Sequence, residues 1–520
     1  MRKIPIGIQG FEKLRTEKFL YVDKTEYIYR LVRNGGQYFL SRPRRFGKSL
    51  FVSSLKAYWE GKKDLFQGCR IAVLEEDNSD AWTKYPVFLF DFSGKNYQQK
   101  GALEEILDEQ MRRWEKEYKI LASAGSLEER FRNILLAAFE QTGRRSVILA
   151  DEYDKSLLET MDHPALEEHN KAVFKGFFSS LKGYDEYIQF VFITGVTKFE
   201  KVSIFSDLNQ LNDISLMEDF SGCCGITEKE LLVNFMPEIE ELAGRQGISV
   251  DECLRMLRNK YDGYRFHYTG ESVYNPFSLL KSFYDKDFGS YWFETGTPTF
   301  LVKKLRSSGL DVRKLADRTL YVNETSLSDY RADNPDPVPL MFQTGYLTIA
   351  GYEPKRRRYT LGFPNEEVKY GMLESLMPAY SSDVAYGTDI YTLDEYVESG
   401  DLEGIRSVFT ALFAGIPYTE DRNPFEHYFQ TVVYLVFTLL GRFVLCEMHT
   451  FSGRIDCKVE TGDYIYLFEF KRDDTAESAL NQIDEMQYAL PFAADSRKVF
   501  KIGVTFDSQK RILDGWKVSE

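Results

Sequence analysis

The chain has 520 residues, of which 43% are hydrophobic and 28% are charged, so it can form packed cores and is not a disordered chain. This length corresponds to roughly three or four domains of ordinary size. The formal net charge of −14 excludes a protein that coats nucleic acid over its whole surface, but it leaves room for a local basic groove.

Membrane and secretion signals are absent from the sequence. No apolar run approaches the roughly 20 residues needed to cross a bilayer, and the N-terminus lacks the apolar stretch of a signal peptide. The six cysteines show neither the paired spacing of a zinc site nor the density of a disulfide framework. We therefore expect a cytoplasmic protein with reduced thiols and no membrane partner.

Short apolar runs alternate with helical patterns between residues 37 and 194. The pattern predicts strands over Gln37–Ser41, Pro86–Phe92, Ser146–Asp151 and Tyr187–Thr194. It predicts amphipathic helices over Ala102–Ser123, Ser126–Gln141 and Ala165–Lys182. This alternation is typical of a parallel β-sheet with helices on both faces.

A phosphate-binding loop is predicted between the first strand and a helix over Ser49–Trp59. Glycine lets the backbone approach a phosphate, lysine reaches the terminal phosphates, and the serine hydroxyl can hold Mg²⁺. Arg42 stands where such a loop usually has its first glycine, and we expect it to add positive charge around a bound anion together with Arg44 and Arg45. The candidate nucleotide-binding residues of the loop are Arg42, Pro43, Arg44, Arg45, Phe46, Gly47, Lys48 and Ser49.

Two further strand ends complete the predicted nucleotide site. The apolar run that begins at Ser146 ends in Asp151 and Glu152. In a P-loop ATPase the aspartate helps the loop serine, here Ser49, to hold Mg²⁺, and the following glutamate polarises the attacking water. Thr194, at the end of the next predicted strand, could sense the γ-phosphate. The sequence thus predicts binding of ATP with Mg²⁺ and leaves open whether ATP is hydrolysed or only bound.

The middle of the chain, residues 227–423, has a mostly helical pattern. Asn275 followed by Pro276 predicts the start of a helix. We interpret the aromatic segment Tyr261–Phe266 as a turn packed against the ATPase core, with base stacking as the alternative. Lys355–Arg358 is the strongest basic run, and we interpret it as a solvated hairpin, with a nucleic-acid phosphate contact as the alternative.

The region from Pro424 to the C-terminus has a mixed pattern of helices and strands. Helices are predicted over Phe425–Leu440 and Ala476–Phe492. Strands are predicted over Arg442–Met448, Ile455–Glu460, Tyr464–Lys471 and Lys498–Phe506.

Paired carboxylates and a lysine occur on two neighbouring predicted strands of this region. The two-residue period of a strand puts Glu469 and Lys471 on one face, and hairpin pairing brings Asp456 beside Glu469. Two carboxylates suit Mg²⁺ or Mn²⁺, and the lysine can orient or deprotonate water. Glu426 on the preceding helix and Gln482 on the following helix are supporting candidates. The alternative is a buried salt bridge between Lys471 and one acid.

Sequence segments in chain order resemble the bacterial and archaeal family that joins an AAA-ATPase-like domain to a C-terminal nuclease of the PD-(D/E)XK superfamily. At the front and in the middle, the matching motifs are Gly7-Ile8-Gln9-Gly10-Phe11, Tyr21-Val22-Asp23-Lys24-Thr25, Arg42–Ser49, Asp151-Glu152-Tyr153-Asp154, Gly195–Phe199, Gly225-Ile226-Thr227, Tyr261–Phe266 and Tyr274-Asn275-Pro276-Phe277. At the end they are Glu426 with Tyr428, Gly453-Arg454-Ile455-Asp456, Glu469-Phe470-Lys471 and Gln482-Ile483.

The resemblance covers nearly the whole chain, and an arginine in place of the first P-loop glycine is typical of the family. The chain departs from the family at Ser156, where proline is frequent, and at Met486-Gln487-Tyr488, where a more basic stretch is frequent. The resemblance implies an α/β fold in three parts. They are an AAA-ATPase-like P-loop domain over residues 1–226, a mostly helical linker region over residues 227–423, and a restriction-endonuclease-like nuclease domain over residues 424–520.

We therefore expect an ATP-binding core that controls or positions a metal-dependent nuclease-like domain acting on nucleic acid, DNA or RNA. One alternative is a nucleotide-dependent switch or scaffold whose nuclease-like domain only binds. Another is a nuclease fused to an ATPase core that has lost hydrolysis. Residues 425–520 hold 11 Lys and Arg against 15 Asp and Glu, so this domain lacks a generally basic surface. A protein partner or self-association stays open.

Overall fold

The structure is a computed structural model that describes residues 2–120, 125–198, 211–293, 299–308, 310, 315, 320–324, 327, 336–380, 386–414, 434–441, 445–448, 455–507 and 512–520. The chain divides into two compact units. The first unit comprises Met1–Gly296 and Arg318–Val368, and the second comprises Thr297–Asp317 and Lys369–Glu520. The predicted middle region, residues 227–423, is therefore shared between the two units.

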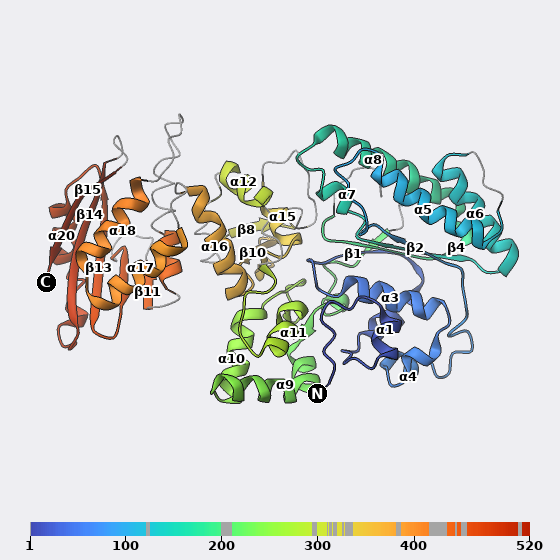
Figure 1. The fold of residues 1–520 in the computed structure, drawn as a ribbon, viewed down its shortest axis with the longest axis horizontal. Helices are drawn as coiled ribbons and strands as arrows, with labels where there is room; N and C mark the ends of the chain where they lie inside the picture. Colours follow the sequence, from blue (N-terminus) through green and yellow to red (C-terminus); the bar gives the residue numbers. More distant parts are fainter. Residues whose placement is uncertain are drawn as a thin grey trace. The chain divides into compact units, whose positions relative to one another are not determined.

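The first unit is built on a five-stranded parallel sheet with the strand order β2-β3-β4-β1-β5 (Figure 1). Its strands are β1 (Gly36–Ser41), β2 (Val87–Asp91), β3 (Ser146–Asp151), β4 (Ile188–Gly195) and β5 (Leu211–Asp213). The first four of these strands were predicted, and the bounds of β3 are those expected from its apolar run. Because parallel strands end at one edge of a sheet, the loop after β1 and the acidic end of β3 lie on either side of the end of β4.

Helices cover both faces of this sheet, as the alternating pattern predicted. One face carries α5 (Ala102–Glu117), α6 (Leu127–Thr142) and α8 (Pro164–Ser179), and the other carries α1 (Phe11–Thr16) and α3 (Lys48–Trp59) (Figure 1). The shorter helices are α2 (Thr25–Asn34), α4 (Arg70–Leu74) and α7 (Lys155–Leu158). Both faces of β3 are buried along its whole length, which is why its residues read as one continuous apolar run.

Helices α9 (Glu228–Gln246), α10 (Val250–Tyr261) and α11 (Pro276–Asp285) follow the sheet within the first unit. Two short strands, β6 (Ile226–Thr227) and β7 (Val273–Tyr274), pair beside them. The predicted start of α11 is confirmed, since the Asn275 side chain accepts hydrogen bonds from the first helical N–H groups. These helices close over a core of their own that includes Leu231, Phe235 and Leu257.

A three-stranded antiparallel sheet in the middle of the chain was not predicted. Its strands are β8 (Leu320–Asn323), β9 (Thr348–Glu353) and β10 (Arg358–Gly362), in the order β8-β10-β9. Helix α15 (Val338–Gln343) precedes it, and α16 (Glu366–Tyr380) follows it. The middle region is still mostly helical, as expected, with α12 (Thr299–Ser308), α17 (Tyr386–Ser399) and α18 (Leu402–Ala414) in the second unit.

The second unit contains a five-stranded mixed sheet with the order β11-β12-β13-β14-β15. Its elements are β11 (Leu445–Met448), β12 (Cys457–Glu460), β13 (Tyr464–Arg472), α20 (Ala476–Glu485), β14 (Lys498–Asp507) and β15 (Ile512–Ser519). Strand β13 is central in this sheet. Helix α20 packs on one face through Leu480 and Ile483, and Phe409 of α18 contacts Phe468 on the other. Most of the predicted helix Phe425–Leu440 lies outside the described residues.

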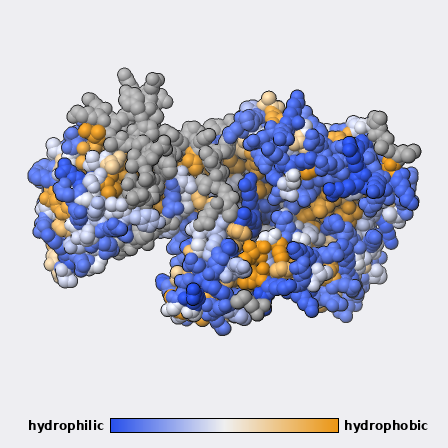
Figure 2. Space-filling model, viewed as in Figure 1, coloured by the Kyte–Doolittle hydropathy of each residue, from blue (hydrophilic) through white to orange (hydrophobic). Residues whose placement is uncertain are grey.

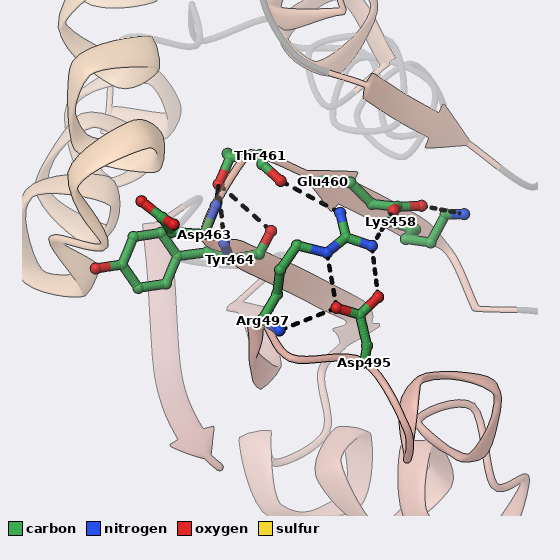
Figure 3. A network of polar contacts seen from close by, with 7 residues as sticks. All are labelled: Lys458, Glu460, Thr461, Asp463, Tyr464, Asp495 and Arg497. Atoms are coloured by element: carbon green, nitrogen blue, oxygen red, sulfur yellow. Dashed lines mark hydrogen bonds and ion pairs between the residues drawn. The ribbon is translucent and has the colours of Figure 1, made fainter.

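A charged network connects the turn between β12 and β13 to the start of β14 (Figure 3). The Arg497 guanidinium donates to Glu460 at 2.8 Å, to Asp495 at 2.7 Å and to the carbonyl oxygen of Thr461 at 3.2 Å. Lys458 also pairs with Glu460, at 2.7 Å. The network therefore holds together the starts of β13 and β14, which are neighbours in the sheet.

Helices of membrane-spanning length and apolarity do not occur in the described parts of the chain.

Candidate nucleotide and nuclease sites

A pocket of about 470 Å³ lies beside the loop between β1 and α3, and its volume is ordinary for a small-molecule site. One wall is polar and contains Gly47, Lys48 and Ser49. The other walls are largely apolar and come from residues 5–9 at the N-terminus, residues 223–226, and Phe277 of α11. Figure 2 shows hydrophobic surface gathered between α11 and α1, on this side of the first unit. The pocket thus joins a phosphate-type loop to an apolar cavity.

The Lys48 side chain crosses the loop and hydrogen-bonds to the backbone on its other side. Its Nζ donates to the carbonyl oxygens of Arg42 and Pro43, each at 3.0 Å. Burial lowers the pKa of Lys48, while the carboxylates of Asp151 and Asp154 favour the charged form. A bound phosphate would offer this ammonium a charged acceptor in place of the two neutral carbonyl oxygens.

The acidic end of β3 lies beside the start of α3. Burial raises the pKa of Asp151 to about 6, and hydrogen bonding from Ser49 and the charge of Lys48 oppose the rise. Glu152 lines the pocket and has a φ of 53°, a left-handed conformation that non-glycine residues seldom adopt. Ser49, Asp151 and Glu152 thus supply a hydroxyl and two carboxylates, which are the types of group that a Mg²⁺–nucleotide site uses.

Asp154 ties the end of β3 to the end of β4. Its carboxylate accepts from the backbone N–H groups of Val196 at 3.0 Å and Thr197 at 2.6 Å, and from the Thr197 hydroxyl at 2.7 Å. Burial raises the pKa of Asp154, and these hydrogen bonds oppose that rise. A Cβ added at Gly195 would lie 2.4 Å from Asp154 Oδ1, so the residue at this position has to be glycine.

Two residues predicted to contact nucleotide have other partners in the structure. Arg42 is buried, and its guanidinium donates to the carbonyl oxygens of Ser215 at 2.8 Å and Phe220 at 2.9 Å. Its expected positive charge is therefore directed at backbone dipoles away from the loop. The Thr194 hydroxyl donates to the carbonyl oxygen of Leu40 at 2.8 Å, and Thr194 is not among the residues that line the pocket. Phosphate sensing by Thr194 stays a prediction.

The aromatic residues after α10 pack directly on the P-loop, which confirms the interpretation of the Tyr261–Phe266 turn. The rings of Phe46 and Tyr264 lie 4.7 Å apart, edge to face. The Arg45 guanidinium stacks 3.9 Å from the Phe277 ring. The Trp292 indole N–H donates to the carbonyl oxygen of Arg44 at 3.1 Å. The loop's conformation is thus set largely by contacts from residues more than 200 positions away, which spacing within the motif could not reveal.

Sequence reasoning also missed the walls of the pocket contributed by the N-terminal segment and by the Cys223–Cys224 pair. The Gly225 N–H donates to the carbonyl oxygen of Phe46 at 3.1 Å, which joins the cysteine segment to the P-loop. The available signal was the presence of Gly7-Ile8-Gln9 and Gly225-Ile226-Thr227 among the family motifs, since local chemistry alone gave these segments no role.

The predicted nuclease residues of the second unit meet where β12 and β13 pair. Asp456 directly precedes β12, and its Oδ2 accepts from the Phe470 N–H at 2.9 Å. Glu469 is only 2% exposed, and its Oε1 lies 3.6 Å from Lys471 Nζ. Gln482 of α20 accepts from Lys471 and donates to Glu469. The structure thus brings Asp456, Glu469, Lys471 and Gln482 together.

The electrostatics of this cluster favour a bound cation. Burial raises the pKa of Glu469 to about 7, and the neighbouring charge of Asp456 adds to the rise. Burial also raises the pKa of Asp456. Glu469 Oε2 is buried and has no hydrogen-bond partner among the described residues. An orphaned carboxylate oxygen beside a second carboxylate fits a hard divalent cation, which would relieve both the burial cost and the repulsion.

Asp456 and Glu469 are the two carboxylates of this cluster, and the described residues contain no group of three or more His, Cys, Asp and Glu placed to hold a metal. Glu426, the third predicted carboxylate, lies outside the described residues. Sequence reasoning missed Tyr488, which follows α20. Burial raises the pKa of its phenol, and the charges of Glu469 and Asp456 raise this pKa further.

Comparisons with known proteins agree with both sites. A family described as "Predicted AAA-ATPase" matches residues 5–205, and the PD-(D/E)XK nuclease superfamily matches residues 424–516. An uncharacterized protein from the vnfD 5′ region of Azotobacter chroococcum mcd 1 is 36% identical over 530 residues, which cover 99% of each chain. A structure of the Aeropyrum pernix ORC2 protein in ADPNP–ADP complexes is similar over 68% of this chain and 92% of that chain, at 10% identity and a TM-score of 0.23.

A TM-score this low supports no argument about the fold, which rests here on the strand order and the family matches. The relative covers the chain from end to end, and the two matched ranges contain the P-loop and the Asp456–Glu469 cluster, respectively. The chain therefore belongs to the family of proteins that join a predicted AAA-ATPase domain to a C-terminal domain of the PD-(D/E)XK nuclease superfamily.

Proposed function

We propose that the chain binds ATP with Mg²⁺ beside the P-loop, and that this binding controls or positions a metal-dependent nuclease domain that cleaves DNA or RNA. The single observation that best supports the proposal is the cluster of Asp456, Glu469, Lys471 and Gln482 in a second unit of the same chain. We further propose that residues 1–226, 227–423 and 424–520 act as its three functional parts.

At the nucleotide site, the Lys48 ammonium would leave the loop carbonyl oxygens and bind the terminal phosphates. Ser49 and Asp151 are the residues that would hold Mg²⁺, which neutralises phosphate charge when bound. Glu152 lines the same pocket and would orient a water molecule for hydrolysis. The apolar walls around Phe277 suit a nucleobase, because aromatic and aliphatic side chains favour its flat face.

At the nuclease site, Asp456 and Glu469 would hold Mg²⁺ or Mn²⁺. When bound, such a cation supplies charge neutralisation at a phosphodiester and lowers the pKa of the attacking water. Lys471 lies close enough to Glu469 to hold or deprotonate that water, and Gln482 fixes both side chains in their places. Glu426 is proposed as a further acidic group.

The experiment compares Asp456→Asn and Lys471→Ala with wild type for Mn²⁺-dependent cleavage of labelled DNA and RNA and for thermal stability. The nuclease proposal predicts that Asp456→Asn loses metal binding and cleavage without loss of stability, because a repelling carboxylate is removed. Lys471→Ala should bind metal but cleave about 10²-fold more slowly.

A structural salt bridge predicts the opposite result. Removing one partner would then cost about 3 to 5 kcal/mol of stability by stranding a buried charge, and wild type would have no cleavage to lose. The exposed turn residue Asp463, changed to asparagine, is the matched control, and it should leave stability and cleavage unchanged.

A further inference from the structure

The strongest basic run of the chain forms the tip of a hairpin in the first unit. Strands β9 and β10 pair antiparallel, and residues 354–357 turn between them. We call β9, β10 and this turn the basic hairpin. Lys355, Arg356 and Arg357 are all exposed, and Arg357 has a φ of 48° at the turn. In a chain with a net charge of −14, this tip is a local concentration of positive charge.

Glu353 neutralises only part of this charge. Its two carboxylate oxygens accept from Arg356 at 2.6 Å and from Arg358 at 2.7 Å. Among the described residues, no ion pair involves Lys355 or Arg357. Two cations at the exposed tip therefore remain available to a negatively charged ligand.

Tyrosines lie on both faces of the small sheet that carries the basic hairpin. Tyr321 of β8 pairs with Thr360, which is two residues from Arg358, so Tyr321 and Arg358 share a face. Tyr321 is 52% exposed, and the Arg358 guanidinium lies 4.1 Å from its ring. On the opposite face Tyr268, which is 38% exposed, stacks on Tyr352 at 4.3 Å.

This combination of groups matches the chemistry of a polynucleotide strand. Lys and Arg bind phosphates without regard to sequence, and an exposed aromatic ring stacks on a base. Bases can reach such a ring when they are unpaired, whereas in a duplex they are stacked within the helix. The charge complementarity and the ring together favour a single strand over a duplex.

We propose that the basic hairpin and Tyr321 bind single-stranded nucleic acid, with Lys355 and Arg357 on phosphates and Tyr321 on a base. The inference deepens the proposed function and rests on it, because it names the substrate class that the nuclease domain would receive. The predicted hairpin at Lys355–Arg358 is confirmed, and the inference adds the phosphate contact that the sequence left as the alternative.

The test measures the affinity of the full-length protein for labelled oligonucleotides of about 20 bases, which are long enough to cover one binding site. Single-stranded DNA, single-stranded RNA and the matching DNA duplex are compared in EDTA without nucleotide, so cleavage and ATP binding do not contribute. The proposal predicts that at least one single strand binds more tightly than the duplex. Duplex binding at least as tight as that of both single strands, or no binding of any oligonucleotide, would overturn it.

Charge reversal supplies the second arm. Lys355→Glu combined with Arg357→Glu should weaken single-strand binding at least about tenfold. The slope of the logarithm of the binding constant against the logarithm of the salt concentration should become shallower by about 1.4, the value for two lost phosphate contacts. The matched control is Arg144→Glu with Arg145→Glu, an exposed arginine pair beside Tyr85 whose reversal changes the net charge equally. Equal weakening by the two double variants would contradict the proposal.

Ring removal supplies the third arm. Tyr321→Ala should weaken binding about tenfold through lost stacking, whereas Tyr321→Phe keeps the ring and should bind like wild type. Unchanged binding by Tyr321→Ala would remove the ring from the site. If binding fails in these assays while Mn²⁺-dependent cleavage persists, the hairpin inference falls and the proposed function stands. If single strands bind as predicted but the wild type cleaves no nucleic acid, the hairpin inference stands and the proposed nuclease function falls.

Discussion

Lys48 is the residue on which the proposed nucleotide site depends most directly. Its ammonium now bridges two carbonyl oxygens of the loop, and these are contacts that a phosphate would replace. Lys48→Ala should abolish the rise in melting temperature that millimolar ATP and Mg²⁺ produce in the wild type. A ligand raises the melting temperature only if it binds the folded protein, and the variant should not bind ATP.

Lys56→Ala is the matched control for that experiment. Lys56 lies further along the same helix and pairs with Glu60, so its removal should leave the ATP-dependent shift intact. An ATP-dependent shift of wild-type size in Lys48→Ala would show that ATP binds elsewhere. No shift in the wild type would show that the site does not bind ATP.

Glu367 should make the stability of the first unit depend on pH. It is buried, it accepts from the Ser278 hydroxyl at 2.8 Å and from the Trp292 N–H at 2.7 Å, and burial raises its pKa to about 7. The folded state therefore holds this proton more tightly than the unfolded state does. Stability should fall as pH rises from about 4.5 to about 7, by up to about 3 kcal/mol, and then level off.

The measurement is chemical denaturation of Glu367→Gln and wild type across that pH range. The amide cannot ionise, so the variant should lose less stability than the wild type between pH 5 and 8. Glu366→Gln, a change at the exposed neighbouring residue, should follow the wild-type profile. Parallel profiles for Glu367→Gln and wild type would remove Glu367 from this role.

Several site residues could be predicted individually and others could not. The two-residue period of β13 and its pairing with β12 correctly predicted that Asp456, Glu469 and Lys471 would meet, because both rules act over a few residues. The partners of Arg42 and Thr194 could not be predicted. Arg42 contacts the carbonyl oxygen of Phe220, 178 positions away, and such contacts depend on the whole fold.

At the scale of elements, the end of β4 and the segment after β3 depend on a close approach. A Cβ at Gly195 would lie 2.4 Å from Asp154 Oδ1 and 2.8 Å from the Tyr153 ring. Gly195→Ala should therefore push Asp154 away from the backbone of Val196 and Thr197 and disturb the acidic end of β3. We expect a loss of about 2 kcal/mol or more in unfolding free energy, as for overpacked sites.

The matched control is Gly94→Ala, since nothing lies within 4 Å of a Cβ added there. The measurement compares the unfolding free energies and the ATP-dependent shifts in melting temperature of the two variants. Equal stability of Gly195→Ala and Gly94→Ala would contradict the close approach that the structure describes.

The elements themselves were predictable where one rule dominated. β3 and the parallel sheet follow from continuous apolar runs between amphipathic helices, because strands buried on both faces need them. The sheet of β8, β9 and β10 was missed. Only a hairpin at Lys355–Arg358 was expected there, because the strands are short and their alternating residues include charges and tyrosines.

At the scale of the whole molecule, the aromatic contacts on the P-loop offer a way for nucleotide to act beyond its pocket. Tyr264, Phe277 and Trp292 all touch loop residues. Trp292 also donates to Glu367, near the point where the chain leaves the first unit at Val368. These contacts connect the loop to Glu367, and we propose that ATP acts on the segment after Val368 through them.

We propose that nucleotide at the P-loop governs cleavage at Asp456 and Glu469. The most direct test of this claim is the rate of Mn²⁺-dependent cleavage of labelled single-stranded DNA and RNA by wild type and Lys48→Ala, each with and without ATP. We predict that ATP changes the wild-type rate severalfold, and that Lys48→Ala cleaves at the nucleotide-free rate whether or not ATP is present. A wild-type rate that is the same with and without ATP would contradict the claim.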